Sequence, residues 1–203
     1  MASPPTFRIR DAVPSPSNTD ALFIGAAFDS CIPHLATVGS ASQWGSQPIT
    51  SRPKFLESRI KSIADASEYL RTRSGDPVRV LIIEAELASG EYLPVGSMTL
   101  RGNYFSQYLL EQEHLDGVTK GQSGDWMFLE TLVTSFEEAT KPYRKGAGAA
   151  LARWAKEWAE ELGLGVMFYE SQGFVKVAPF EATKEGEAPW PGMFLRMDLG
   201  KKE

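Results

Sequence analysis

The segment from Trp126 to Gly163 constrains the fold more than any other part of the chain. Residues 126–134, WMFLETLVT, are rich in β-branched and aromatic side chains and predict a strand. Soon after it, YRKGAGA sets glycines and basic residues directly before a segment with helical periodicity. That segment carries an apolar stripe at i, i+3, i+4, i+7, i+8 and i+11, made of Leu151, Trp154, Ala155, Trp158, Ala159 and Leu162. Gly163 is suited to end the helix. A strand, a basic glycine turn and an amphipathic helix together predict an α/β domain.

The glycine turn at residues 143–149 has the features of an anion site. Glycine-rich turns at helix N-termini gather unpaired N–H groups and the positive end of the helix dipole, which suit a phosphate. The nucleotide P-loop, a Gly followed after four residues by Gly-Lys-Ser/Thr, is absent from the sequence. The dinucleotide fingerprint also fails, because Leu151 stands where a third small residue is needed. The turn therefore suits some other phosphate-bearing ligand.

The remaining elements follow from periodicity and turn residues. Residues 7–10 alternate as a first strand, and residues 18–20 offer caps for a helix that Pro33 limits. Pro53 suits the first turn of a second helix. Residues 78–83 and 94–100 predict a hairpin, and residues 174–177 and 193–199 predict closing strands. We expect a single domain over residues 1–203, with residues 1–5 loose at the start.

Composition and charge exclude several classes of protein. The 203 residues are 42% hydrophobic and 23% charged, which suits one substantial core. With 21 Lys+Arg against 26 Asp+Glu, the net charge is −5, so no global basic field exists to hold nucleic acid. The apolar runs are too short for a membrane span, and Met1–Pro5 lacks a basic and apolar leader. We therefore expect a soluble, cytoplasmic protein with no nucleic-acid or membrane partner; a homodimer is compatible with the sequence.

Cysteine and histidine are scarce. Cys31 is the single cysteine, which excludes an internal disulfide and a multi-cysteine metal site. The only histidines are His34 and His114, so we expect no metal centre. Cys31 and His34 are three residues apart and suggest a thiol nucleophile, but Pro33 lies between them and no Asp or Asn pattern orients the histidine. A buried structural cysteine is the favoured interpretation.

The stretch LETLVTSFEEATKPYRKGAGAALARWAKEWA, followed by FYESQGFVKV, resembles the acetyl-CoA-binding half of the GNAT superfamily of N-acetyltransferases. The motifs match over residues 126–177, and the order of elements matches over most of the chain. The resemblance implies a mixed, mainly antiparallel central sheet flanked by helices. It further implies acetyl-CoA as co-substrate, no metal, and acetyl transfer to a primary amine; the acidic chain favours a small-molecule amine as acceptor.

The resemblance also assigns roles to residues. The strand before the turn would present backbone to the pantetheine arm through Leu132, Val133 and Thr134. The turn would hold the pyrophosphate with its amides and positive charge, through Tyr143, Arg144, Lys145, Gly146, Ala147, Gly148 and Ala149. Tyr143 stands where the family has Arg or Gln, and Arg144 could take over that role. Tyr169 would protonate the departing thiolate; the alternative is that it packs with Phe168.

Glu130 is the candidate general base. It alternates onto the face of Trp126, Phe128 and Leu132, where apolar neighbours would raise the pKa of its carboxyl and let it take the amine's proton. The alternative is that Glu130 accepts hydrogen bonds at a strand edge. The aromatic residues Trp44, Tyr104, Phe105 and Tyr108 either wall an acceptor pocket or pack down as loop aromatics.

The chain departs from the family pattern after the amphipathic helix. Only residues 164–168 separate Gly163 from Tyr169, where the family has a further strand and the start of a helix. Either Val166 to Ser171 becomes a short strand that turns at Gln172-Gly173, or the cofactor cleft lacks a wall. The second case would leave a non-catalytic GNAT-like protein that binds CoA or a partner.

Overall fold

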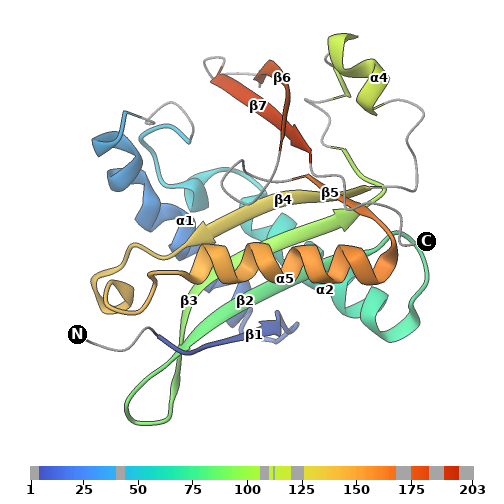
Figure 1. Cartoon of the computed structure of the whole chain (residues 1–203). Helices are drawn as coiled ribbons and strands as arrows, with labels where there is room; N and C mark the ends of the chain where they lie inside the picture. The colour runs from blue at the N-terminus through green and yellow to red at the C-terminus, as the bar shows by residue number, and fades with distance from the viewer. Residues whose placement is uncertain are drawn as a thin grey trace. The chain divides into compact units, whose positions relative to one another are not determined.

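A computed structural model of the chain describes residues 5–39, 44–105, 110–111, 113–119, 126–167, 175–182 and 190–196. The chain divides into two compact units: Met1–Thr99 with Thr131–Leu151, and Leu100–Glu130 with Ala152–Glu203. A five-stranded sheet has the order β1-β2-β3-β4-β5, and β6 and β7 form a separate two-stranded sheet (Figure 1). The fold is mixed α/β, as the sequence predicted.

Three strands of the first unit follow the predicted pattern. β1 (Phe7–Asp11) pairs antiparallel with β2 (Val78–Glu86), so that Ile9 lies opposite Ile83. The β-branched centre of β2 is fully buried, because both of its faces are covered. β3 (Tyr92–Gly102) follows through a turn in which Gly90 has φ +82°. The predicted hairpin is therefore confirmed, with both strands longer than expected.

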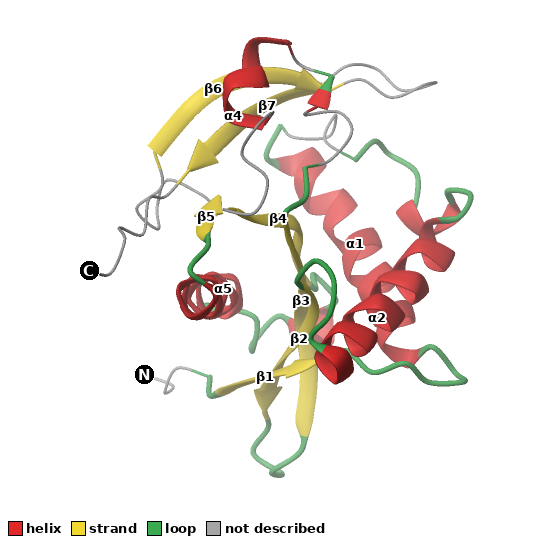
Figure 2. Ribbon diagram, turned by 90° about the vertical axis from the view of Figure 1, so that its right-hand side faces the viewer, coloured by secondary structure: helices red, strands yellow, loops and turns green. Residues whose placement is uncertain are grey.

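Two long helices belong to the first unit. α1 (Thr19–Thr37) and α2 (Phe55–Thr72) contact each other and lie on one face of the strands, whereas the first turn of α5 lies on the other face (Figure 2). α2 begins shortly after Pro53, as predicted. Pro33 does not end α1, which continues to Thr37; proline removes one helical hydrogen bond there without stopping the last turn. The short 3-10 helix η2 (Ile49–Ser51) joins the two.

An ion-pair network ties β1 to β2 and α1. Glu84 accepts hydrogen bonds from Arg8 and Arg10, and Arg10 also binds both carboxylate oxygens of Asp20 at 2.7 and 2.8 Å. Asp20 Oδ2, the oxygen that Arg10 binds at 2.7 Å, also accepts the Val13 N–H at 2.8 Å. The side chains of Glu84 and Asp20 are only 6% and 10% exposed, so these pairs satisfy charges that would otherwise be costly to bury.

β4 (Trp126–Thr134) runs antiparallel to β3, because the Ser135 N–H donates to the Val95 carbonyl and the Asn103 N–H to the Trp126 carbonyl. The 3-10 helix η4 (Glu138–Thr140) follows, and α5 spans Ala147–Leu162. The predicted stripe of α5 is buried or half-buried apart from Leu162. Gly163, at φ +69°, ends the helix as predicted, and the Leu164 N–H donates back to the Ala159 carbonyl at 2.9 Å.

The second unit also holds the closing elements. β5 (Gly165–Met167) pairs parallel with the start of β4, Trp126 opposite Gly165. β6 (Val175–Ala182) pairs antiparallel with β7 (Trp190–Arg196), which begins before the predicted residue 193. The loop before β4 contains η3 (Glu113–Leu115) and α4 (Asp116–Thr119). Residues 1–4 lie outside the described residues.

Candidate functional site: the turn between β4 and α5

The turn that leads into α5 is closed by backbone hydrogen bonds. The N–H groups of Tyr143 and Arg144 both donate to the Thr140 carbonyl, at 2.9 and 3.0 Å. Gly146 then adopts φ +93°, a conformation that residues with a Cβ rarely take. A Cβ at Gly146 would make only an ordinary contact, 3.6 Å from Phe7, so the backbone conformation and not lack of space requires glycine. Glycine at this position is therefore what lets the chain enter the helix directly.

The amides around this turn are mostly unpaired. Within the described residues, no protein acceptor binds the N–H groups of Lys145, Gly146, Gly148 or Ala149. The Ala147 N–H is the exception, since it donates to the Arg144 carbonyl at 3.0 Å. Ala147 was expected to offer its amide to a ligand, but closing the turn already uses that group. The unpaired amides lie at the positive end of the helix dipole.

Arg144 carries a buried hydrogen-bond donor next to these amides. Its guanidinium lies over the ring of Phe136, 4.1 Å from the ring centre, and His34 stacks on the same ring with centres 4.3 Å apart. Among the described residues, no acceptor binds Arg144 Nη1, although this atom is buried. A buried charged donor without an acceptor costs stability, so an anion that paired with it would bind favourably.

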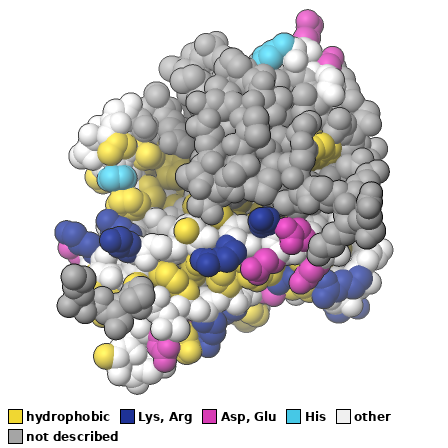
Figure 3. All heavy atoms as spheres, viewed as in Figure 1, with side chains coloured by type: hydrophobic (Ala, Val, Ile, Leu, Met, Phe, Trp, Pro, Cys, Tyr) yellow, Lys and Arg dark blue, Asp and Glu magenta, His cyan; other side chains and the backbone are white. Residues whose placement is uncertain are grey.

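Exposed cations add to the charge of the turn. In Figure 3, Lys and Arg side chains gather at the left of the view, over the segment that leads into α5. Lys145 is exposed, and Lys141 is exposed in a pair with Glu138 at 3.2 Å. Tyr143, which occupies the family's Arg/Gln position, is half-buried. Positive charge thus comes from the neighbours of Tyr143.

The end of β4 has an edge without a strand partner. β5 pairs only with Trp126–Phe128, so in the described part of the chain no strand covers Leu132–Thr134 on that side. The short strand that the sequence analysis allowed after Gly163 is therefore present, although it begins at Gly165 and residues 168–171 lie outside the described residues. An extended ligand could add to such an edge by backbone hydrogen bonds.

Two glycines permit close approach to this end of β4. A Cβ at Gly96 in β3 would lie 2.8 Å from the Val133 carbonyl oxygen, closer than real contacts allow. A Cβ at Gly148 would lie 3.7 Å from Leu132, which is an ordinary contact. Gly96 is thus required by strand packing, whereas Gly148 is not required by any described protein neighbour.

Cys31 is structural, as the sequence analysis favoured. The residue is 5% exposed, and its Sγ donates to the Thr134 carbonyl at 3.2 Å. Burial raises the pKa of the Cys31 thiol to about 11, outweighing the opposite effects of Ser30 and Arg144. The thiol is therefore protonated at neutral pH and is a poor nucleophile.

Glu130 makes an ion pair that the sequence analysis did not include. Its Oε2 accepts a hydrogen bond from Arg101 Nε at 2.5 Å, and both side chains are half-buried. The pair places a guanidinium directly beside the Glu130 carboxylate. Arg101 was missed by the sequence reasoning, although a lone charged residue at the end of an apolar strand was a usable signal. The role of Glu130 as a base stays a prediction, and Tyr169 lies outside the described residues.

The loop aromatics pack against other rings. The ring centres of Trp44 and Phe28 lie 4.8 Å apart. Tyr104 and Phe105 lie 5.7 and 6.5 Å from Phe128. These contacts agree with the packing alternative, and Tyr108 lies outside the described residues. Phe136, which supports both His34 and Arg144, was not singled out from the sequence, because nothing in its local pattern distinguishes it from a core residue.

Within the described residues, no group of three or more His, Cys, Asp or Glu side chains is placed to hold a metal ion. No helix among the described residues is long and apolar enough to cross a membrane. No protein-family model matches the chain, and no curated protein matches its sequence.

Proposed function

We propose that the chain is an acetyl-CoA-dependent N-acetyltransferase of the GNAT type that acetylates a primary amine of a small molecule in the cytoplasm. The observation that carries the proposal is the set of unpaired amides at Lys145, Gly146, Gly148 and Ala149. A pyrophosphate offers several negative oxygens, and adjacent N–H groups at a helix N-terminus are suited to bind them. The sequence resemblance supplies the identity of the ligand.

Arg144 and the end of β4 fit the same ligand. The buried Nη1 of Arg144 lacks an acceptor among the described residues, and a phosphate oxygen would provide one. The uncovered edge at Leu132–Thr134 would hydrogen-bond the amides of the pantetheine arm as a further strand would. Gly148 leaves the backbone bare where the pyrophosphate would approach it.

Acetyl transfer needs a residue that accepts a proton from the amine and a residue that donates a proton to the thiolate. Bound acetyl-CoA supplies a thioester whose carbonyl carbon forms a C–N bond with the amine as the C–S bond breaks. Glu130, which is paired with Arg101, accepts the proton of the incoming ammonium group, directly or through water. Tyr169 gives its hydroxyl proton to the departing thiolate and is afterwards reprotonated from solvent. The resemblance implies no metal in these steps.

The second candidate is a non-catalytic protein that binds CoA or a protein partner through the same fold. Two observations favour it: in the described part of the chain β5 spans only Gly165–Met167, and the Glu130 carboxylate is already held by Arg101. Binding of acetyl-CoA without turnover is the result that this candidate predicts.

Calorimetric titration of the full chain with acetyl-CoA tests the site first. We expect micromolar affinity, about −8 kcal/mol, and a loss of at least tenfold for Gly146→Asp, which adds a carboxylate and a Cβ where the amides are bare. Gly90→Asp is the matched control, because Gly90 also has positive φ, +82°, but lies in the β2–β3 turn. Circular dichroism confirms that each variant is folded. A folded wild type that does not bind acetyl-CoA would contradict the enzyme and leave, of the second candidate, only a protein that binds a partner.

An amine screen then separates the two candidates. The release of free CoA thiol is followed with a panel of small primary amines. Turnover that falls strongly in Glu130→Gln and Tyr169→Phe, with acetyl-CoA affinity unchanged, is expected for the enzyme. Binding without turnover on any amine would leave the non-catalytic protein.

A further inference from the structure

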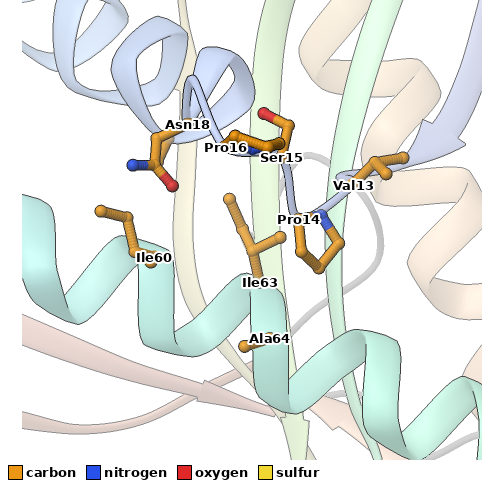
Figure 4. Close-up of a pocket in the computed structure, with 9 residues that line it drawn as sticks. Val13, Pro14, Ser15, Pro16, Asn18, Ile60, Ile63 and Ala64 are labelled. Carbon is orange, nitrogen blue, oxygen red and sulfur yellow. The ribbon is translucent and has the colours of Figure 1, made fainter.

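A cavity of about 400 Å³ lies in the first unit, between the loop that follows β1 and one face of α2. Its walls are formed by Val13, Pro14, Ser15, Pro16, Asn18, Ala21, Ile60, Ile63 and Ala64 (Figure 4). No lining residue is charged. The volume falls within the range of small-molecule pockets, and the walls are mainly apolar with a few polar groups, as such pockets usually are.

Asn18 supplies an unused polar group to this cavity. It occupies the position before α1, where an asparagine side chain usually caps the helix, but it has φ +51° and makes no capping bond. In Figure 4 the carboxamide instead points across the pocket toward Ile60. Within the described residues no protein group hydrogen-bonds this side chain. A carboxamide both donates and accepts, so it can pair with an amide or a hydroxyl of a ligand.

The loop that forms one wall is held in place before any ligand arrives. The Val13 N–H donates to Asp20, which is itself fixed by Arg10. The Asn18 N–H donates to the Ser15 carbonyl at 3.0 Å. Pro14 and Pro16 fix φ in the loop between these bonds. Binding therefore orders little of the chain, which favours affinity for a small ligand.

We propose that this cavity binds an uncharged, mainly apolar small molecule that carries one amide or hydroxyl group for Asn18. The proposal goes beyond acetyl transfer and does not depend on it, because all lining residues lie outside the β4–α5 turn. Lack of charge in the lining argues against an ionised ligand, whose desolvation nothing in the pocket would offset.

The test is a titration of the full chain, labelled with ¹⁵N, followed by amide chemical shifts. N-phenylacetamide is the neutral probe, toluene is the probe without an amide, and phenylacetate is the charged probe. We expect N-phenylacetamide to bind saturably at millimolar concentration or below, with shifts centred on residues 13–21 and 60–64. Toluene should bind more weakly, and phenylacetate should leave these amides unchanged.

Three variants sharpen the result. Ala64→Phe fills the cavity from an exposed helix position and should weaken N-phenylacetamide at least tenfold, whereas Ser58→Phe, exposed elsewhere on α2, should not. Asn18→Gly accepts the positive φ without strain and removes the carboxamide. It should weaken N-phenylacetamide roughly threefold to tenfold and leave toluene unchanged. The proposal is overturned if no saturable shift appears at the cavity, or if Ala64→Phe and Ser58→Phe behave alike.

Discussion

Two clusters of charged and polar groups in the first unit differ in one respect. At the β1–α1 cluster, Arg10 is held by Asp20 and Glu84, and the carboxylates there accept further bonds from the protein. At the β4–α5 turn, Arg144 Nη1 and several backbone amides find no acceptor among the described residues. Native structures rarely leave buried polar groups unsatisfied unless a ligand or solvent satisfies them. The first cluster is therefore structural, whereas the second leaves donors for solvent or a ligand.

The largest effect is expected from breaking the satisfied cluster. Arg10→Met leaves two buried carboxylates without their shared cation, and we expect a loss of about 3 kcal/mol in the free energy of unfolding. Urea unfolding followed by circular dichroism measures it. Lys61→Met is the control, because Lys61 is 74% exposed in its pair with Asp65 and should cost less than about 0.5 kcal/mol. Equal losses in the two variants would show that the buried network does not stabilise the fold.

Alanine variants of Gly96 and Gly148, the two glycines beside β4, should distinguish a glycine needed for strand packing from one needed for ligand binding. Gly96→Ala forces a methyl group to within 2.8 Å of the Val133 carbonyl and should cost about 2 kcal/mol of stability. Gly148→Ala meets only an ordinary contact and should change stability by less than about 1 kcal/mol, in either direction. Acetyl-CoA titration of Gly148→Ala then reports whether the bare backbone matters for binding. If Gly148→Ala also unfolded the chain readily, its role would be structural.

Arg144→Met should lower the affinity for acetyl-CoA and leave stability nearly unchanged, whereas Arg10→Met should lower stability. Methionine keeps the contact with Phe136 and removes the donor that lacks an acceptor, so stability should stay within about 0.5 kcal/mol of wild type. Affinity for acetyl-CoA should fall about tenfold or more, because a charge-assisted hydrogen bond is lost. Arg73→Met is the control, since that guanidinium also lies near an aromatic ring, Tyr69, but on α2. Unchanged affinity in Arg144→Met would remove Arg144 from the binding site.

Local sequence patterns predicted most elements of the first unit but not the contacts between distant segments. The elements of the first unit follow from local patterns: β-branched runs gave β2, and glycine and proline marked the turns and the start of α2. Gly146 was also identified correctly as a turn residue, because positive φ is a local property. The partner of Glu130 was not found, since Arg101 meets it only through the pairing of β3 with β4. Contacts between distant segments depend on register, which single-residue patterns do not specify.

The predictions for the two ends of α1 differed from the structure for another reason. Pro33 was expected to limit α1, which continues past it to Thr37, because a proline near the C-terminal end of a helix costs one hydrogen bond and packing of the buried face offsets it. Residues 18–20 were expected to offer caps for α1, but Asn18, which takes the N-cap position, is left-handed and its side chain makes no capping hydrogen bond. In both cases the wider fold overrode a local preference. At Asn18 the departure coincides with the apolar cavity, which is why the residue became informative.

The smallest effect is expected from lowering the pH, which should reduce the contribution of Asp20 in the β1–α1 cluster to the free energy of unfolding. Burial raises the pKa of the Asp20 carboxyl, but hydrogen bonds from Arg10 and the Val13 N–H, with the charge of Arg10, more than compensate, so the pKa lies below its ordinary value. A depressed pKa in the folded state means that Asp20 contributes stability above its unfolded pKa, about 3.9. That contribution is lost as the pH falls through the folded pKa.

Urea unfolding of wild type and Asp20→Asn as a function of pH measures this contribution. The carboxamide of the variant cannot titrate, and the other carboxylates titrate in both proteins, so the difference between the two curves isolates Asp20. We expect the difference to be constant above about pH 5 and to shrink as the pH falls below about 4. A difference that did not change with pH would mean that Asp20 acts through packing and neutral hydrogen bonds. The charged carboxylate would then not be what joins α1 to β1.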